Sequence, residues 1–409
     1  MAKIKERILF YLFLLKISYV ENIIIIKFAL MIGIEFDINN PLFYVLSFLT
    51  LLTIIILVYY YFVFTKLAFY KPPPKKNNRE EGVSIVICAH NECHVLVRHL
   101  PLILTQNYPN YEVIVVDDNS DDDTVDLLKQ LQNQHKHLRY ISLDNEKRNF
   151  FKGKKFPLAL GIKEAKNEIL LLTDADCIPE SEMWLKNMQS HFNDDIDIVL
   201  GYGAYDNRKT LLNRFIRFDT IHTAMQYFSF ALSGVPYMGV GRNLAYRKSL
   251  FIKNKGFSSH YHVLSGDDDL FINQVANKKN IAIEIAAKSH TISVPKRAWR
   301  TWFKQKRRHL TTGKHYKKKH QLMLGLYGLS LFLFYVLSIV LLALNYNIII
   351  VIALLLLKLF SWLIIFKKTM IRLNESNLLL ISPIIELITA VFMPFFIATN
   401  KFIKSNTWK

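Results

Sequence analysis

Cysteine is scarce in this chain of 409 residues. The three that occur, Cys88, Cys93 and Cys177, are odd in number and lack the spacing of a disulfide framework or a zinc site. This usage excludes a disulfide-stapled secreted scaffold and fits a reducing compartment. The chain also lacks a GxxxxGKS or GxxxxGKT phosphate loop, which argues against an ATP-driven transporter.

Acidic residues are few as well. The formal net charge is +19, and residues 288–319 contain no acidic residue. Nucleic acid and an anionic membrane surface would both attract such a chain. The position of the charge favours the membrane, since the basic run 288–319 leads into one apolar segment and a second basic group follows another. That second group is Lys66, Lys71, Lys75 and Lys76. Basic residues beside apolar spans mark cytoplasmic loops, and we expect no nucleic-acid partner.

Charged residues are missing altogether from residues 41–64, a run long enough to cross a hydrocarbon core of about 30 Å. Residues 322–344, 348–366 and 378–398 are three further apolar candidates. The last contains two prolines and Glu386, so it could span the membrane, lie in its interface or re-enter. Few ionisable residues occur in these segments, which gives little support to an ion relay.

The remaining boundaries follow from composition. Residues 1–40 are apolar but interrupted by charges and lack a small-residue cleavage site, so an interfacial helix or a poorly formed span are both open. Residues 65–81 contain three consecutive prolines and form a stiff linker. We expect a soluble domain over 82–319, three membrane or interfacial helices over 320–400, and a basic tail over 401–409.

The soluble domain alternates short apolar runs with helical patterns. Strands are predicted at residues 83–88, 112–116, 169–172 and 196–200, and helices at 94–105, 124–134 and 156–165. This alternation predicts an α/β fold with a mostly parallel sheet and right-handed crossovers. Ligands bind such sheets at the carboxyl ends of the strands. Polar residues gather there, namely His90, Asn91, Glu92, Asp117, Asp118, Asp174 and Asp176.

Two pairs of carboxylates directly follow strands. Asp174 and Asp176 flank a small residue and could hold Mg²⁺ against the phosphates of a substrate, although solvated acids in a turn fit equally well. Asp117 and Asp118 close the preceding strand, where capping of the next helix is the alternative. Capping accounts for Ser120 and the acids after it, but not for the pair at the strand end.

A third acidic cluster and a basic helix follow later in the chain. Asp267, Asp268 and Asp269 are adjacent, and their mutual repulsion can raise one pKa toward the range of a general base. A capped helix start is the alternative. Gln305 and Arg308 could bind a diphosphate, and the aromatic ring of Trp302 could hold a sugar. A basic amphipathic helix on the membrane surface competes with that interpretation.

Five segments in this order, VSIVICAHNE, VVDDNSDD, LLTDADC, GDDDL and QKRRH, resemble the family 2 inverting glycosyltransferases, and the membrane-bound, synthase-like members above all. The resemblance covers roughly residues 83–309. It implies a GT-A fold, which is a Rossmann-type mostly parallel sheet, here flanked by transmembrane helices. It also implies a nucleoside-diphosphate sugar donor, most often a uridine diphosphate (UDP) sugar, and Mg²⁺ or Mn²⁺ as cofactor.

The same resemblance implies a role for each matching residue. Asp174 and Asp176 would bind the metal and the diphosphate, and Asp268 would be the catalytic base. On the donor side the resemblance places Asn91, Glu92, Asp117, Asp118, Lys154, Asp174, Gln305 and Arg308. On the acceptor side it places Asp267, Trp302 and His309. His309 stands where processive members have Trp, which favours transfer of one or few sugars over synthesis of a long polymer.

The sequence therefore predicts a membrane-bound hexosyl- or N-acetylhexosaminyltransferase. Its acceptor would be a lipid-linked glycan, another membrane lipid or a polysaccharide. The expected location is the bacterial inner membrane, with the catalytic domain in the cytoplasm and possible partner proteins of a glycan assembly pathway. The alternative is a membrane scaffold, or a subunit of a polysaccharide export system, that binds a nucleotide sugar without turnover.

Overall fold

The computed structural model describes residues 37–72, 79–143 and 153–399. Most of the expected N-terminal segment, part of the proline linker and the basic tail lie outside these ranges. The chain divides into two compact units, one formed by residues 1–57 and 327–361, the other by residues 58–326 and 362–409.

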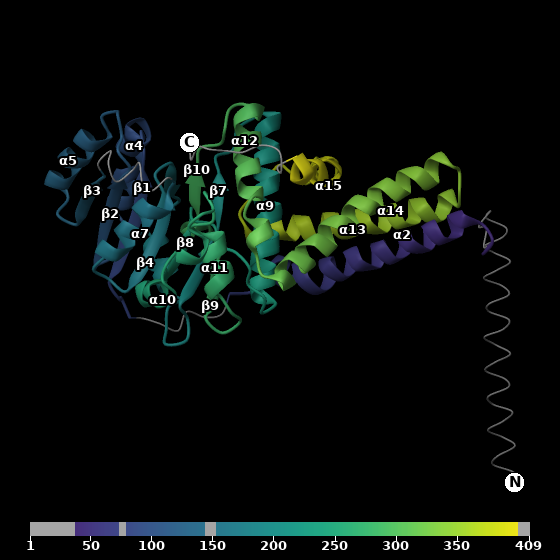
Figure 1. The fold of residues 1–409 in the computed structure, drawn as a ribbon, viewed down its shortest axis with the longest axis horizontal. Coiled ribbons are helices and arrows are strands. Elements are labelled where there is room, and N and C mark those ends of the chain that lie inside the picture. The colour runs from purple at the N-terminus through teal and green to yellow at the C-terminus, as the bar shows by residue number, and fades with distance from the viewer. Residues whose placement is uncertain (1–36, 73–78, 144–152, 400–409) are drawn as a thin grey trace, which may run out of the picture. The chain divides into compact units, whose positions relative to one another are not determined.

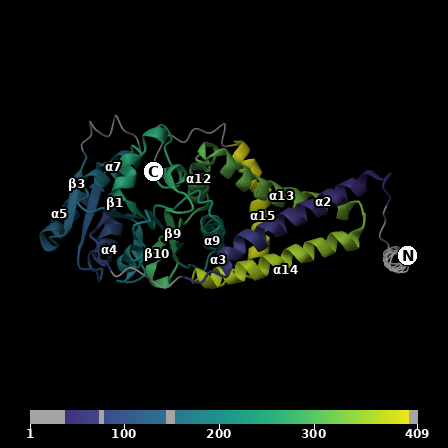
Figure 2. The same ribbon diagram turned by 90° about the horizontal axis from the view of Figure 1, so that it is seen from below.

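The first unit contains most of three long apolar helices, which lie side by side (Figures 1 and 2). They are α2 (Pro41–Val58), α13 (Lys318–Ala343) and α14 (Ile348–Arg372). Among the described residues, three helices are long and apolar enough to cross a membrane: Pro41–Ala68, Lys318–Ala343 and Ile348–Arg372. Lys358 is buried among them and donates a 2.7 Å hydrogen bond to the hydroxyl of Tyr335. These helices support the expectation of a membrane protein.

The second unit opens with the end of the first span. A six-residue π-helix (Tyr59–Phe64) and α3 (Thr65–Ala68) extend the helix beyond the expected residue 64. Two adjacent side chains of this stretch hold it in place. The Tyr59 hydroxyl donates to the carbonyl of Met323 at 2.7 Å, and the Tyr60 hydroxyl donates to the buried carboxylate of Glu386 at 3.0 Å.

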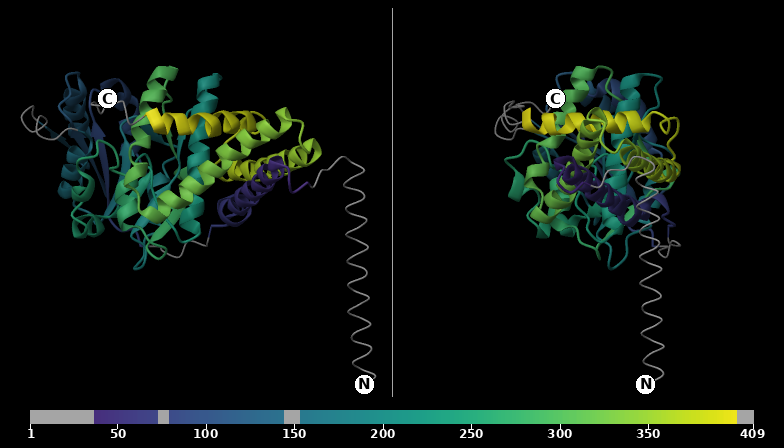
Figure 3. Two further views of the ribbon diagram at one scale, coloured as in Figure 1. Left: turned by 45° about the vertical axis from the view of Figure 1, so that its right-hand side comes forward. Right: turned by 90° about the vertical axis from the view of Figure 1, so that its right-hand side faces the viewer.

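The last apolar segment forms α15 (Ser382–Thr399), which is not among the three candidate spans. It packs beside α9 (Leu211–Leu232) and α12 (Trp299–Leu310) (Figure 3). The ring of Phe396 stacks on Phe303 with centroids 5.1 Å apart, and Trp362 donates to Ser382 at 3.1 Å. The first contact joins α15 to α12, and the second joins it to α14.

A seven-stranded sheet is the centre of the second unit, in the order β3-β2-β1-β4-β8-β6-β9 (Figure 1). All neighbours are parallel except β8, which runs antiparallel to β4 and to β6. A second sheet has the order β5-β10-β7. The strands are β1 (Val83–Ala89), β2 (Tyr111–Asp117), β3 (Leu138–Ser142), β4 (Ile169–Asp174), β5 (Cys177–Pro179), β6 (Ile198–Gly201), β7 (Gly203–Tyr205), β8 (Leu244–Arg247), β9 (Ile281–Glu284) and β10 (Thr291–Ser293).

Helices cover both faces of the larger sheet, as Figure 2 shows for α7 on one side and α4 on the other. One core is built by alternate residues of β1, β2 and β4 together with apolar residues of α4, α5 and α8. Both faces of these strands are buried, which explains their nearly continuous Val, Ile and Leu. The helices are α4 (Cys93–Leu104), α5 (Thr124–Gln134), α7 (Lys155–Glu164), α8 (Trp184–Gln189), α10 (Lys248–Lys253) and α11 (Asp269–Val275).

The predicted α/β class and the four predicted strands are confirmed, and the structure adds an antiparallel strand between two of them. Strand β6 does not pair with β4, because β8 is inserted between them. The sequence does not predict that β8 takes this place, because contacts between strands decide which strands pair, and no local pattern reveals them. The long helix α9 and the smaller sheet were also not predicted.

Packing on the sheet allows a test at Gly161 in α7, where an added Cβ would lie 2.7 Å from Val86 and 2.9 Å from Val116. We expect Gly161→Ala to overpack this contact and to destabilise the protein by about 1–3 kcal/mol. Gly325→Ala in α13 is the matched control, because no atom lies within 4 Å of its added Cβ. Thermal unfolding of the detergent-purified protein measures both. Equal melting temperatures for the two variants would contradict this packing.

Candidate active site

The carboxyl end of β4 carries the Asp174–Asp176 pair predicted from the sequence. One carboxylate oxygen of each lies within 4.8 Å of the other and of the Cys177 sulfur. The Cys177 thiol is buried beside Ser293, 2.9 Å from its hydroxyl, and burial raises its pKa. The thiol therefore stays protonated, and the two carboxylates are the ligands that this corner offers to a hard cation.

Lys154 joins two of the acidic clusters. Its ammonium donates to Asp174 and lies 3.5 Å from Asp267, and its side chain is 14% exposed. Burial alone would lower the pKa of Lys154, but the two carboxylates outweigh it and raise this pKa well above its usual value. Burial likewise acts to raise the pKa of Asp174, and Lys154 outweighs it and lowers this pKa. The ion pairs thus bring two like-charged clusters to one place.

Asp268 is held by backbone amides. Its carboxylate accepts from the N–H of Gly241 at 2.7 Å and from the N–H of Asp269 at 2.8 Å, where it caps α11. Burial, followed by the charges of Asp267 and Asp269, raises the pKa of Asp268 to about 7. A carboxylate with this pKa can accept a proton near neutral pH, as a general base must.

The third acid of this cluster has a different surrounding. Asp269 is buried and accepts from the hydroxyls of Thr312 at 2.5 Å and Tyr316 at 2.7 Å. Both partners lie between α12 and α13, so Asp269 ties the cluster to the start of a candidate membrane span. The three adjacent acids therefore contact three different groups: Lys154, the backbone at Gly241, and the α12–α13 connection.

Arg242 belongs to the site although the sequence analysis missed it. Its guanidinium lies 4.3 Å from the ring centroid of Tyr205 and donates to the carbonyl of Ala204 at 3.2 Å. Its positive charge lowers the pKa of Asp174. The sequence signal that could have found it is the Gly239-Val-Gly241 segment before β8. Gly241 leaves room for the carboxylate of Asp268, because a Cβ added at Gly241 would lie 3.3 Å from a carboxylate oxygen of Asp268.

Helix α12 contributes two of the predicted residues. Arg308 is near enough to Asp174 for its charge to lower that pKa, after the larger effects of burial, Lys154 and Arg242. Gln305 hydrogen-bonds the side chain of Tyr205. Both residues therefore face the β4 and β7 ends. His309, the penultimate residue of the helix, is exposed.

Trp302 lies elsewhere on the same helix. It is 9% exposed and packs in a cluster with the rings of Phe215, Trp299 and Phe303. Aromatic edge and tilted contacts of this kind stabilise a helix interface. In this structure Trp302 thus packs α12 against α9, and the acceptor contact implied by the family resemblance stays a prediction.

The loops after β1 and β2 are tied to each other by Asn91. Its N–H donates to the Ser120 hydroxyl at 2.8 Å, and its side-chain oxygen accepts from the N–H of Asp121 at 2.7 Å. Asn91 has φ 56°, a left-handed conformation that Asn tolerates. The N–H of its neighbour Glu92 donates to the Thr124 hydroxyl at 3.2 Å.

Asp117 and Asp118 are both buried at the end of β2. The carboxylate of Asp117 accepts from Ser142 at 3.0 Å and from the N–H of Ser120 at 3.3 Å. The backbone carbonyl of Asp118 lies 2.9 Å from Nδ1 of His90. Asp117 thus orders the turn before α5, but it does not cap the helix, because the N-cap residue is Asp123 and Asp123 makes no side-chain capping hydrogen bond.

A divalent cation fits the donor set of this corner. Two carboxylates, one of them partly exposed beside Lys154, are oxygen ligands of the kind that Mg²⁺ or Mn²⁺ uses together with substrate phosphates. Burial and the charge of Asp174 raise the pKa of Asp176, so the pair repels itself until a cation or a proton neutralises it. Asp174 and Asp176 are the residues that would hold the ion.

Comparison with known proteins gives the class. Residues 84–254 match the family Glycosyl transferase family 2. The chain is 29% identical over 237 residues to the probable glycosyltransferase YdaM of Bacillus subtilis, covering 55% of this chain and 54% of that protein. It is 30% identical over 128 residues to the Escherichia coli UDP-Glc:alpha-D-GlcNAc-diphosphoundecaprenol beta-1,3-glucosyltransferase WfaP, covering 31% and 46%. The matched segments thus span about half of these relatives.

The fold is similar to that of the mannosyltransferase PcManGT from Pyrobaculum calidifontis, solved in complex with GDP-Man and Mn²⁺. That likeness has a TM-score of 0.53 at 16% identity and covers 84% of this chain and 99% of that one. Residues 84–254 therefore match a family 2 glycosyltransferase domain, and the fold is GT-A-like; both findings agree with the family resemblance that the sequence motifs indicate.

The geometry at the end of β4 generates a test of metal binding. We expect Mn²⁺ to bind the wild-type protein in the presence of UDP, and Asp176→Asn to weaken this binding by about tenfold or more, because one of two anionic oxygen ligands is lost. Electron paramagnetic resonance of free Mn²⁺ measures it without catalysis. Asp195→Asn, at an exposed position, is the control. Equal Mn²⁺ affinity in all three proteins would contradict the site.

Proposed function

We propose that this protein is a membrane-bound inverting glycosyltransferase that moves one sugar from a nucleoside-diphosphate sugar to a membrane-presented acceptor. The observation that carries the proposal is the pair of ionic contacts of Lys154, which join the Asp174–Asp176 corner to the Asp267–Asp269 cluster. One site thereby combines two parts: a pair of acids that could bind a metal–diphosphate, and a carboxylate that could act as a base.

In the proposed reaction, Asp268 removes the proton from an acceptor hydroxyl. The hydroxyl oxygen attacks the anomeric carbon of the donor from the face opposite the diphosphate, and a single displacement inverts that carbon. The diphosphate leaves with the electron pair of the broken bond, and the cations of Arg242 and Arg308 stabilise its charge. A bound Mg²⁺ or Mn²⁺ would add charge neutralisation at the diphosphate.

UDP is the nucleotide that we propose for the donor, and the sugar would be a hexose or an N-acetylhexosamine. Asp117 and Asp118 would contact the uridine end. WfaP, one of the relatives, is named for a UDP-sugar donor and a lipid-diphosphate acceptor, which supports a lipid-linked acceptor here. The exposed His309 in place of a stacking Trp supports single transfer. We place the catalytic domain on the cytoplasmic side of a bacterial inner membrane, because basic residues flank the spans.

The first experiment measures release of nucleoside diphosphate from a panel of UDP- and GDP-sugars. Membranes carrying the full chain are assayed with and without Mn²⁺ and with added lipid extract as acceptor. We expect metal-dependent release from one donor, and a fall of roughly 10²- to 10⁴-fold in kcat for Asp268→Asn, since a general base contributes about this much. Asp195→Asn serves as the control. Donor binding without release in the wild type would instead favour the non-catalytic scaffold.

The raised pKa of Asp268 predicts the pH dependence. Only the deprotonated carboxylate accepts a proton, so kcat/KM should rise with pH up to about 7 and level off above it. Asp267→Asn removes one of the charges that raise this pKa, and the acid limb should move to lower pH. An acid limb in the same place for both proteins would contradict Asp268 as the base.

A further inference from the structure

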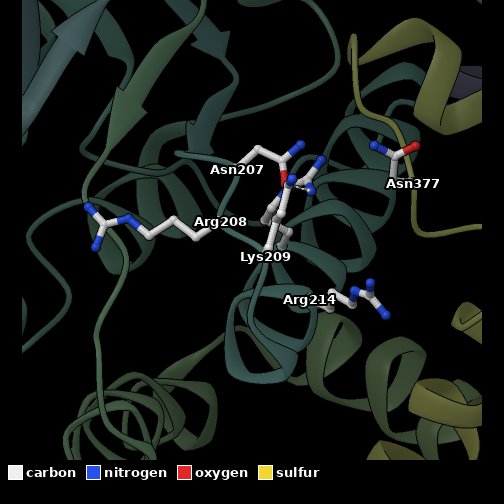
Figure 4. A pocket seen from close by; sticks show the side chains of 6 residues that line it. Asn207, Arg208, Lys209, Arg214 and Asn377 are labelled. Atoms are coloured by element: carbon white, nitrogen blue, oxygen red, sulfur yellow. Dashed lines mark hydrogen bonds between the residues drawn. The ribbon is translucent and has the colours of Figure 1, made fainter.

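A pocket of about 160 Å³ lies away from the Asp174–Asp176 corner, at the start of α9 (Figure 4). Four of the six residues that line it are cations. The lining residues are Asn207, Arg208, Lys209, Arg214, Arg217 and Asn377. None of the six is acidic, so the pocket offers positive charge and amide groups. We refer to it as the basic pocket.

Arg217 forms the fixed wall of the basic pocket. Its guanidinium donates to the Glu375 carboxylate at 3.1 and 2.5 Å, to the carbonyl of Ser376 at 3.0 Å and to Asn207 at 2.7 Å. Glu375 also accepts from the Tyr202 hydroxyl at 2.8 Å. Both side chains of the ion pair are about 5% exposed or less. This network is fully engaged before any ligand arrives, and it shapes the pocket.

The other three cations of the pocket differ in their contacts. Arg208 donates to Asp206 at 3.2 Å. Lys209 and Arg214 are exposed and make neither an ion pair nor a side-chain hydrogen bond to any part of the chain that the structure describes. Counting both adjacent carboxylates, Asp206 and Glu375, four cations face two anions. The remaining positive charge repels itself in the empty pocket, and an anion would relieve it.

The helix adds to this preference. Thr210 caps α9 by accepting from the N–H of Asn213 at 3.2 Å, so the positive end of a 22-residue helix dipole points toward the basic pocket. Arginine forks and helix N-termini are the groups that proteins use for phosphate oxygens. The charge, the donors and the size of the pocket therefore match a phosphoryl group.

The pocket also lies at the depth of lipid headgroups. Asn377 and Glu375 belong to the loop that follows Arg372, the last residue of α14. A helix of 25 residues is about 37 Å long, longer than a hydrocarbon core of about 30 Å, so its end leaves the core. The loop after it is then at the membrane surface, where the phosphates of lipids are found.

We propose that the basic pocket binds the phosphate group of a membrane lipid or of a free phosphate compound. Where the ligand is a lipid, the bound group is the phosphate of the lipid-linked acceptor. This inference rests on the proposed function for the membrane position and the acceptor. Asn207 follows Tyr205 by two residues, and the Tyr205 ring contacts Arg242 of the active site. A phosphate held there would keep its attached sugar next to the donor.

The test compares lipids that differ only in phosphate. Native mass spectrometry of the detergent-solubilised full chain measures retention of phosphatidic acid and of diacylglycerol with the same acyl chains, and inorganic pyrophosphate is added as a separate arm. We expect selective retention of phosphatidic acid and about a tenfold loss of it in the double variant Lys209→Ala/Arg214→Ala. Lys278→Ala/Lys279→Ala, on another exposed surface, is the matched control and should retain it fully.

Each outcome decides the proposal. Loss of phosphatidic acid in the double variant alone supports a lipid phosphate site. Binding of pyrophosphate alone, with the same dependence on Lys209 and Arg214, supports a site filled from solution. Equal retention by all three proteins, or equal retention of both lipids, would overturn the basic pocket as a phosphate site. Donor-dependent release of UDP without acceptor, measured in parallel, shows separately whether the proposed enzyme activity exists.

Discussion

The geometry of the site depends on one largely enclosed cation between carboxylates, the ammonium of Lys154. Asp174 and Asp267 come from distant parts of the chain, and without a positive charge between them their repulsion would separate the two clusters. Lys154 supplies that charge. It is the N-cap residue of α7 and follows Gly153, which has φ 102°. The next residue extends the effect, because the buried ammonium of Lys155 donates to the carbonyls of His260 and Val263 and so holds the loop before Asp267.

The neighbouring acids show how one local sequence serves several purposes. Asp268 is desolvated yet accepts from two backbone amides, which keeps the cost of ionising it moderate. Asp269 is committed to Thr312 and Tyr316, and Asn273 of the same helix lies 2.9 Å from Nδ1 of His320 in α13. The proposed base is therefore mounted on a helix that is fixed to the start of a candidate membrane span.

Local patterns were enough to predict the parallel strands and the acids at their ends. A strand that is buried on both faces is a continuous apolar run, and an acid directly after such a run is placed at a sheet edge wherever the strand pairs. The position of β8 and the role of Arg242 could not be predicted this way. Both depend on pairing between segments distant in sequence. The glycines at 239 and 241 mark a close approach of the backbone, but they do not reveal the role of the arginine that follows them.

The same limit applies to the basic pocket, whose wall is a buried ion pair between α9 and the loop after α14. Such pairs add little net stability, because desolvation offsets their attraction, but breaking one is costly. Arg217 and Glu375 therefore act mainly to fix position: they join this loop to Tyr202, directly after β6. The loop after α14 is thereby held in a fixed position on the sheet that carries the proposed catalytic groups. An acceptor anchored by its phosphate would be aligned with the donor by the fold itself, without a separate binding domain.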